Sequence, residues 1–291
     1  MQPLVVLTAT YNHPNELKKL YESLRKQSDH EFSWVIVDDG SGEETRRALE
    51  DVIKEDELDI TVIHQENGGK SRAINRGLDA MEGTAEFVII VDDDEQLVPE
   101  AISIIKEYVG KYKNSDCGVI HFNRRNEKGE VIATPPITED FFMSYQQFKA
   151  ERRFADGYVG YFCDKLGDQR FRVCDGEKYV APSVLFMQVT LCCQLLWAKA
   201  VLGDTEYLDG GITKQGRRLR LKNPLGMMEY CDMMLAKRVG VKSKLLYSIQ
   251  WYAYQSLCIQ KDSGEGFRNG RVKLMKPFGR LLAFCWKVKY K

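Results

Sequence analysis

Short apolar runs alternate with amphipathic stretches through the first part of the chain. The runs at 4–8, 34–37, 60–63, 87–91 and 118–122 have the length and the β-branched composition that are typical of buried strands. The stretches between them read as helices over 15–26, from about 43, over 70–81 and over 99–112. Strands that alternate with helices specify a mainly parallel sheet with helices on both faces. The sequence therefore predicts an α/β fold.

The rest of the chain has a less regular pattern. A hairpin turn is expected at 126–129, and a helix could form at 184–191, although periodicity leaves 184–207 ambiguous. Two further helices are expected, one from Pro224 to about 238 and one over 241–261. Residues 272–291 interleave aromatic side chains with lysine and arginine, a pattern that suits an amphipathic helix on an anionic membrane surface. Packing on the protein's own helices, or on a second copy in a homodimer, explains the same apolar residues equally well.

Four acidic residues follow the apolar run at 87–91, which reads FVIIV and continues as DDDE. Four carboxylates in succession stay ionised together only when positive charge lies among them. Mg²⁺ or Mn²⁺ would supply that charge, because these ions bind one or two carboxylates and fill their other positions with water and phosphate oxygens. On an extended chain Asp92 and Asp94 point to one side and Asp93 to the other. The alternative is a solvated acidic turn before the helix at 99–112.

Two more polar clusters follow strands of the predicted sheet, at 8–12 and 38–41. The carboxyl ends of parallel strands form the ligand cleft of such sheets, so all three clusters should converge. Asp38 and Asp39 suit hydrogen bonds to a nucleotide base or to ribose hydroxyls. The segment NGGKSR at 67–72 opens a helix with two glycines and two cations and suits a diphosphate, although paired glycines also make ordinary turns. Together the clusters predict a site for a metal-bound nucleoside diphosphate.

Composition limits the remaining possibilities. The chain carries 42 lysines and arginines and 42 acidic residues, so its overall charge predicts neither a nucleic-acid nor a membrane partner. The eight cysteines include no CxxC spacing, which favours a reducing cytosol over a disulfide framework. No basic segment precedes the first apolar run, and no stretch of about 18 apolar residues is present to span a bilayer. A cytoplasmic protein is expected.

Seven motifs in order resemble a known family. LTATYN, VIVDDGS, NGGKSRAINRGL and FVIIVDDDEQL look like the N-terminal half of a family 2 glycosyltransferase with the GT-A fold. RFRVCDGEKYVAPSVLF, EYLDGGITKQ and RLKNPLGMMEY resemble the members of that family that make capsular and other cell-surface polysaccharides. The likeness covers residues 1 to about 240. It implies a Rossmann-like, mainly parallel GT-A sheet flanked by helices, with short strands at 195–198 and 201–207, followed by a C-terminal helical extension.

The resemblance also implies roles for individual residues. Asp92 and Asp94 match the DxD pair, with Asp94 the metal ligand and Asp92 nearer the ribose, and Asp93 is counted with the nucleotide-binding residues. Asp39 matches the acid that contacts the base, with Asp38 beside it. The other implied nucleotide contacts are the base-pocket residues Thr8, Thr10 and Tyr11 and the diphosphate residues Lys70 and Arg72. The loop that starts at 209 and runs into Lys214, Arg217, Arg218 and Arg220 could close over the diphosphate, because it pairs glycines with cations; a solvated charged surface is the alternative.

Members of the family invert the anomeric configuration, which requires a general base for the acceptor hydroxyl. Glu177 is the first candidate and Asp175 the second. Many relatives carry Glu-Asp where this chain has Glu177 and Lys178. The structural alternative is that Glu177 pairs with Lys178 or caps a helix that begins near Pro182.

These observations predict a metal-dependent inverting glycosyltransferase that uses Mn²⁺ or Mg²⁺ and a UDP-linked sugar. Its acceptor would be a hydroxyl of a glycan or of a lipid-linked saccharide in bacterial surface polysaccharide synthesis. The expected domains are a GT-A catalytic domain at 1–222, divided into a nucleotide-sugar half at 1–123 and an acceptor half at 124–222, and a helical region at 223–291. The expected location is the cytoplasm, or the inner face of the plasma membrane. Two other classes stay open, a nucleotide-sugar-binding scaffold without turnover and a DxD phosphoryl-transfer enzyme.

Overall fold

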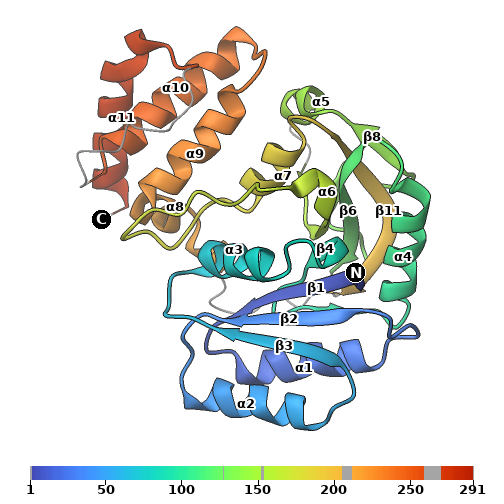
Figure 1. Ribbon diagram of the computed structural model, residues 1–291. Coiled ribbons are helices and arrows are strands. Elements are labelled where there is room, and N and C mark those ends of the chain that lie inside the picture. Colours follow the sequence, from blue (N-terminus) through green and yellow to red (C-terminus); the bar gives the residue numbers. More distant parts are fainter. Residues whose placement is uncertain (1, 127, 152–153, 205–211, 259–269, 291) are drawn as a thin grey trace. The chain divides into compact units, whose positions relative to one another are not determined.

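The computed structural model describes residues 2–126, 128–151, 154–204, 212–258 and 270–290 (Figure 1). The chain divides into two compact units. Unit 1 comprises Met1–Gln169 with Val189–Tyr207, and unit 2 comprises Arg170–Gln188 with Leu208–Lys291. The domain limits expected from the sequence, 1–222 and 223–291, stay a prediction.

Unit 1 is built on a nine-stranded sheet with the order β3-β2-β1-β4-β10-β6-β11-β5, and β8 also pairs with β11. The strands of this sheet are β1 (Gln2–Thr10), β2 (Ser33–Asp38), β3 (Asp59–His64), β4 (Ala85–Ile90), β5 (Gln96–Leu97), β6 (Cys117–Arg125), β8 (Phe141–Met143), β10 (Gly157–Phe162) and β11 (Gln194–Asp204). A separate two-stranded sheet joins β7 (Ala133–Thr134) to β9 (Phe154–Ala155). The mixed α/β architecture confirms the predicted fold class.

The sheet has a parallel part and a mixed part. β3, β2, β1 and β4 run parallel, as the apolar runs predict. β10 lies antiparallel to both β4 and β6, and β11 runs parallel to β6. The strands expected at 195–198 and 201–207 form the single strand β11, whose register shifts between Trp197 and Val201 and again between Val201 and Gly203. Residues 205–207 lie outside the described residues.

β10 has no apolar run because two of its positions must be glycine. A Cβ on Gly160 would lie 2.4 Å from the ring of Phe87, and a Cβ on Gly157 would lie 2.1 Å from the carbonyl oxygen of Phe122. Glycine in a strand interior marks such a close approach and at the same time lowers strand propensity. The sequence pattern therefore missed the strand that joins the parallel part to the rest of the sheet.

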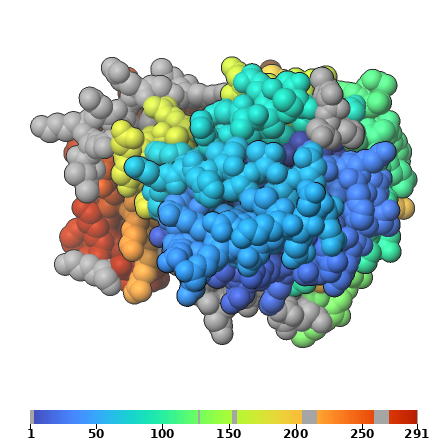
Figure 2. Space-filling model, turned by 60° about the horizontal axis from the view of Figure 1, so that its bottom comes forward, coloured from blue at the N-terminus to red at the C-terminus, as the bar shows by residue number. Residues whose placement is uncertain are grey.

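Helices cover both faces of the parallel part (Figure 1). The helices of unit 1 are α1 (Pro14–Arg25), α2 (Glu43–Lys54), α3 (Lys70–Ala80), α4 (Ala101–Tyr112), α5 (Tyr145–Glu151) and α6 (Cys163–Leu166). The predicted apolar stripe of α1 is buried, and it joins a core with α2, α4 and alternate residues of β1 and β2. On the opposite face α3 packs so closely that a Cβ on Gly77 would lie 2.3 Å from Leu7. The first third of the chain, blue in Figure 2, forms one continuous surface of this unit.

Unit 2 is helical. Its helices are α7 (Ser183–Val189), whose last residue belongs to unit 1, α8 (Ile212–Lys222), α9 (Pro224–Leu235), α10 (Val241–Gln255), the 3₁₀ turn η1 (Lys273–Met275) and α11 (Lys276–Lys289). α10 lies between α9 and α11 (Figure 1). α9 ends before the predicted residue 238, because Ala236 is extended and Lys237 takes a left-handed conformation at φ 53°. α10 ends at Gln255, and part of the predicted stretch to 261 lies outside the described residues.

A buried ion network fixes the turn that follows β4. Arg124, on β6, pairs through Nη1 with Glu95 and through Nη2 with Asp156. Only 10% of the Arg124 side chain and 7% of the Glu95 side chain are exposed. The second carboxylate oxygen of Glu95 accepts the backbone N–H of Asp92 at 3.0 Å. A core strand thus holds the acidic turn through one charged side chain.

We expect Arg124→Met to lower the free energy of unfolding by about 3–5 kcal/mol, because it leaves two carboxylates without their buried counter-charge. The matched control is Arg125→Met, the next residue on β6, whose partner Asp204 has 59% of its side chain exposed. Loss of that surface pair should cost about 1 kcal/mol or less. Urea denaturation of both variants measures the difference. Equal effects would show that the Arg124 network does not hold the turn.

Candidate active site

Three strand ends meet at one edge of the parallel sheet. β1 lies between β2 and β4, with Thr10 opposite Asp38 and Leu7 opposite Ile90. The backbone N–H of Asp39 donates to the carbonyl of Thr10 at 2.9 Å, and that of Val91 donates to the carbonyl of Leu7 at 3.0 Å. The polar residues that follow these strands therefore lie at one edge of unit 1, as the sequence predicts.

Three of the four acids after β4 have a cationic partner, each from a different element. Asp92 pairs with Lys70 at the first position of α3, Asp93 with His13 just before α1, and Glu95 with Arg124 on β6. The fourth acid, Asp94, is exposed and has no ion-pair partner among the residues that the structure describes. Basic side chains of the protein therefore pair with three of the four carboxylates, Asp92, Asp93 and Glu95, and none of the described residues pairs with Asp94.

The charges of the turn shift the pKa values of their neighbours. Desolvation raises the pKa of Asp94, and the negative charges of Asp92 and Asp93 raise it further. Desolvation alone would lower the pKa of Lys70, but the charge of Asp92 and its hydrogen bond outweigh this effect, and the pKa of Lys70 is raised. The hydrogen bond to Asp93, whose Oδ2 lies 3.1 Å from Nδ1 of His13, raises the pKa of His13. The charges of Asp92 and Asp93 thus make it harder to ionise Asp94.

The metal prediction rests on Asp94 and Asp92. Among the described residues, no group of three or more His, Cys, Asp or Glu side chains is arranged to hold a metal ion. Mg²⁺ and Mn²⁺ need only one or two carboxylates when phosphate and water fill the other positions. Asp94 and Asp92 lie two residues apart in one turn and supply that number of oxygen ligands, so the donor set fits a hard divalent cation.

Asp39 organises the glycine loop before α3. Its Oδ1 accepts hydrogen bonds from Gln65 Nε2 at 2.7 Å and from the backbone N–H of Gly68 at 2.8 Å. Its Oδ2 accepts the N–H of Gly69 at 2.8 Å. Gly69 has φ 91°, a conformation that L side chains rarely adopt. The buried carboxylate therefore sets the course of the backbone into α3, and its predicted contact with a base stays a prediction.

Asp38 fixes the neighbouring loop. Its Oδ1 accepts the N–H of Ser41 at 2.9 Å, and its Oδ2 lies 2.9 Å from Nδ1 of His64. Desolvation would raise the pKa of this buried carboxyl, but the hydrogen bonds from Ser41 and His64 outweigh it and lower the pKa. Asp38 is thus held as a carboxylate beside Asp39.

The two threonines of β1 have different surroundings. The Oγ1 of Thr8 accepts the indole N–H of Trp34 at 3.0 Å, so this hydroxyl is used inside the core. Thr10 is 1% exposed, and its Oγ1 has no hydrogen-bond partner among the described residues. Tyr11 is 47% exposed. The side chain of Arg72 packs against the glycine loop, because a Cβ added to Gly68 would lie 2.5 Å from the Cδ of Arg72. Of the three residues predicted to line the base pocket, Thr10 and Tyr11 are therefore those whose polar atoms could meet a ligand, whereas the hydroxyl of Thr8 is used in the core.

Glu177 caps a helix of unit 2. Its Oε1 accepts the N–H of Leu225 at 2.8 Å and its Oε2 that of Gly226 at 2.9 Å, at the first turn of α9. The carboxyl is half-buried, and desolvation raises its pKa against the lowering effect of these two bonds. The helix that it caps begins at Pro224, not near Pro182 as the structural alternative expected. Asp175 is exposed in the turn before Gly176, and the choice between the two as general base stays a prediction.

The sequence does not indicate this cap, because the residue before α9, Asn223, is of a type that commonly caps helices. In the structure Asn223 does not cap α9, because its Oδ1 accepts the backbone N–H groups of Lys178 and Tyr179. The first amides of a helix need acceptors, and Glu177 supplies two of them here. Arg124 was also missed, although an arginine inside a buried strand demands acidic partners.

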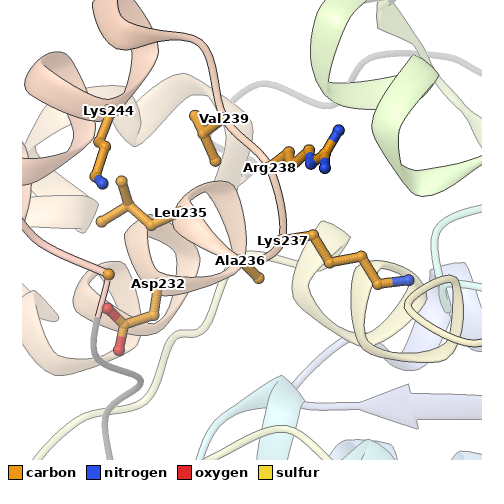
Figure 3. Close-up of a pocket in the computed structure, with 8 residues that line it drawn as sticks. Asp232, Leu235, Ala236, Lys237, Arg238, Val239 and Lys244 are labelled. Atoms are coloured by element: carbon orange, nitrogen blue, oxygen red, sulfur yellow. The ribbon is translucent and has the colours of Figure 1, made fainter.

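One further predicted element begins outside the described residues. The loop expected to close over a diphosphate begins at 209, and 205–211 lie outside the described residues. A hollow of about 590 Å³ lies in unit 2 and is lined by Asp232, Leu235, Ala236, Lys237, Arg238, Val239, Lys244 and Gly270 (Figure 3). None of the predicted site residues lines it.

Known structures share this fold. *Staphylococcus aureus* TarS 1–349 in complex with UDP-GlcNAc superimposes with a TM-score of 0.64 at 17% identity, covering 95% of this chain and 78% of that one. A mannosyltransferase from Pyrobaculum calidifontis, in complex with GDP-Man and Mn²⁺, gives a TM-score of 0.58 at 13% identity, covering 98% of this chain and 75% of that one. At these identities the likeness shows the fold alone.

Curated sequences show a closer but partial likeness. A teichoic acid poly(glycerol phosphate) polymerase of Staphylococcus epidermidis is 28% identical over 117 residues, which are 40% of this chain and 16% of that protein. The poly(ribitol-phosphate) β-N-acetylglucosaminyltransferase TarS of Staphylococcus aureus is 29% identical over 131 residues, which are 44% of this chain and 22% of that protein. This chain thus spans less than a quarter of the length of these relatives. The family model described as "Glycosyl transferase family 2" matches residues 5–169, more than half of the chain and all three strand ends of the site, so the chain belongs to glycosyl transferase family 2.

Proposed function

We propose that this chain is a metal-dependent inverting glycosyltransferase that moves a sugar from a UDP-linked donor to a hydroxyl of a glycan or lipid-linked acceptor. The pathway would be bacterial surface polysaccharide synthesis on the cytoplasmic side of the membrane. One observation carries the proposal. Three of the four acids after β4 have a protein cation as partner and Asp94 has none among the described residues, at the strand edge where sheets of this class bind nucleotides.

The donor would lie along the ends of β1 and β2. Thr10 supports a base pocket here, because its buried hydroxyl lacks a partner among the described residues. Asp39 and Asp38 lie at the same edge, and the N–H groups of Gly68 and Gly69 donate to Asp39, which holds the glycine loop just before α3. A helix N-terminus with lysine at its first position suits a diphosphate. Lys70 and Arg72 would pair with the diphosphate oxygens.

Asp94 and Asp92 would hold the divalent cation. A bound Mn²⁺ or Mg²⁺ ion would stabilise the charge of the departing diphosphate. The mannosyltransferase from Pyrobaculum calidifontis is in complex with Mn²⁺, which supports a cation of this class. Lys70 would add positive charge on the same leaving group, and Glu95 would keep the turn in place through the N–H of Asp92.

The general base would come from Asp175 or Glu177. Because both oxygens of Glu177 accept helix amides, its carboxylate is committed to holding α9. The contacts therefore favour Asp175 as the group that takes the proton of the acceptor hydroxyl, with Glu177 as the residue that holds the loop. The same contacts support the second candidate, a nucleotide-sugar-binding protein without turnover, since the first-choice base is structurally engaged. Nuclear magnetic resonance of reactions with UDP-sugars separates the two, because only an enzyme gives an inverted glycoside.

For the metal ligand, we expect Asp94→Asn to weaken the binding of UDP in the presence of Mn²⁺ by about tenfold or more, because one anionic ligand is lost. Isothermal titration with and without the metal measures this effect. The matched control is Asp51→Asn on α2, an exposed acid that pairs with Lys18 on the surface. Unchanged UDP affinity in Asp94→Asn would exclude it as the metal ligand.

For the base, we expect Asp175→Asn to lower kcat by about a hundredfold or more while the melting temperature stays unchanged. Glu177→Gln should instead lower stability by about 1 kcal/mol, because a glutamine retains only one acceptor oxygen for the α9 amides. Steady-state kinetics and thermal unfolding of both variants provide the two measurements. A large loss of kcat in Glu177→Gln, with normal stability, would assign the base to Glu177.

A further inference from the structure

Helix α11 has two apolar faces, and only one of them packs on the residues that the structure describes. Gly279, Ala283 and Trp286 are buried. At Gly279 the helix approaches α10 so closely that a Cβ would lie 2.5 Å from the Cβ of Tyr252. Further along, the ring of Trp286 lies 5.0 Å from that of Tyr254. These contacts fix which face of α11 is turned inward.

The other face carries large apolar side chains in solvent. The α11 ridge consists of Leu274 (76% exposed), Phe278 (55%), Leu281 (62%), Phe284 (65%) and Val288 (63%). Leu274 lies in the 3₁₀ turn η1 just before α11, and the other four are three or four residues apart, which places them on one stripe of α11. A contiguous stripe of this kind on a soluble surface marks an interaction site.

Positive charge flanks the ridge. Lys273, Lys276, Arg280, Lys287 and Lys289 are all exposed, and the sequence of α11 contains no acidic residue. From Met233 to the end, the sequence holds thirteen lysines and arginines and two acidic residues, although the whole chain is balanced at 42 of each. The charge imbalance is therefore concentrated around this helix.

We propose that the α11 ridge docks on the interface of an anionic lipid bilayer. The apolar side chains would enter the boundary between headgroups and acyl chains, and the flanking cations would reach the lipid phosphates. α11 has 14 residues, fewer than the roughly 20 that a spanning helix needs, so it would lie in the plane of the surface. The described helices include none with the length and apolarity of a membrane span.

The positive charge beside the α11 ridge also favours a bilayer over a second copy of the chain as its partner. A two-fold dimer would place the same patch of both subunits face to face. Five flanking cations would then meet five like charges without an acidic residue of α11 to separate them, whereas anionic lipids supply the opposite charge. The proposal does not depend on the transferase activity.

The test is co-sedimentation of the full chain with vesicles of phosphatidylcholine, alone or with about 30 mol% phosphatidylglycerol. We expect binding to the anionic vesicles only. Phe278→Ser/Leu281→Ser/Phe284→Ser should weaken that binding at least about tenfold. Lys276→Gln/Arg280→Gln/Lys287→Gln should weaken it about a hundredfold, at about fivefold per cation.

Matched controls remove similar groups from unit 1. Ile53→Ser, at a side chain 46% exposed on α2, and the exposed set Lys19→Gln/Arg46→Gln/Lys128→Gln should leave vesicle binding unchanged. Circular dichroism verifies that every variant is folded, and UDP titration should be unaffected by the ridge variants. Absence of anionic-vesicle binding, or ridge variants that bind as well as the controls, would overturn the proposal. A dimer that the serine variant dissociates, without vesicle binding, would assign the ridge to a second copy.

Discussion

The acidic turn after β4 is held by three basic side chains from separate elements. Lys70, His13 and Arg124 come from α3, the loop before α1 and β6, and each pairs with a different carboxylate of the turn. Arg124 also pairs with Asp156, and His13 is charged only when it is protonated. Without them, four successive carboxylates would repel one another and raise one another's pKa values. The sheet order brings these elements together, since β1 lies between β2 and β4 and β10 links β4 to β6. The charge balance of the turn therefore depends on the strand order of the sheet.

The strands of the parallel part could be predicted because their own residues determine them. Buried on both faces, β2 needs apolar side chains at nearly every position, and the sequence shows that run directly. β10 depends instead on its neighbours, because Gly157 and Gly160 are required by Phe122 and Phe87 far along the chain. Residue type alone cannot reveal a constraint that another strand imposes.

The same reasoning explains what could be predicted of the site. Its location follows from the polar residues that end three strands, whereas the acids themselves lie in a turn after β4 and not on an extended chain. The partners could not be predicted, because Arg124 meets acids 29 and 32 residues away and only the strand register decides which. For Glu177 the family motif suggests a general base. The structure adds two backbone N–H donors from α9, which lie 48 and 49 residues further along the chain.

The ion pairs of the turn differ in how easily they can exchange partners. Arg124 and Glu95 are almost completely buried, so separating them would leave a charge in a medium that solvates it poorly. Lys70 and Asp92 are more than a third exposed, and a pair of that kind contributes about 1 kcal/mol or less. An incoming diphosphate could therefore draw Lys70 away from Asp92 at little cost, which frees a carboxylate next to Asp94. The buried pair meanwhile holds the backbone of Asp92 in place, so the exchange changes the charge of the site without moving the turn.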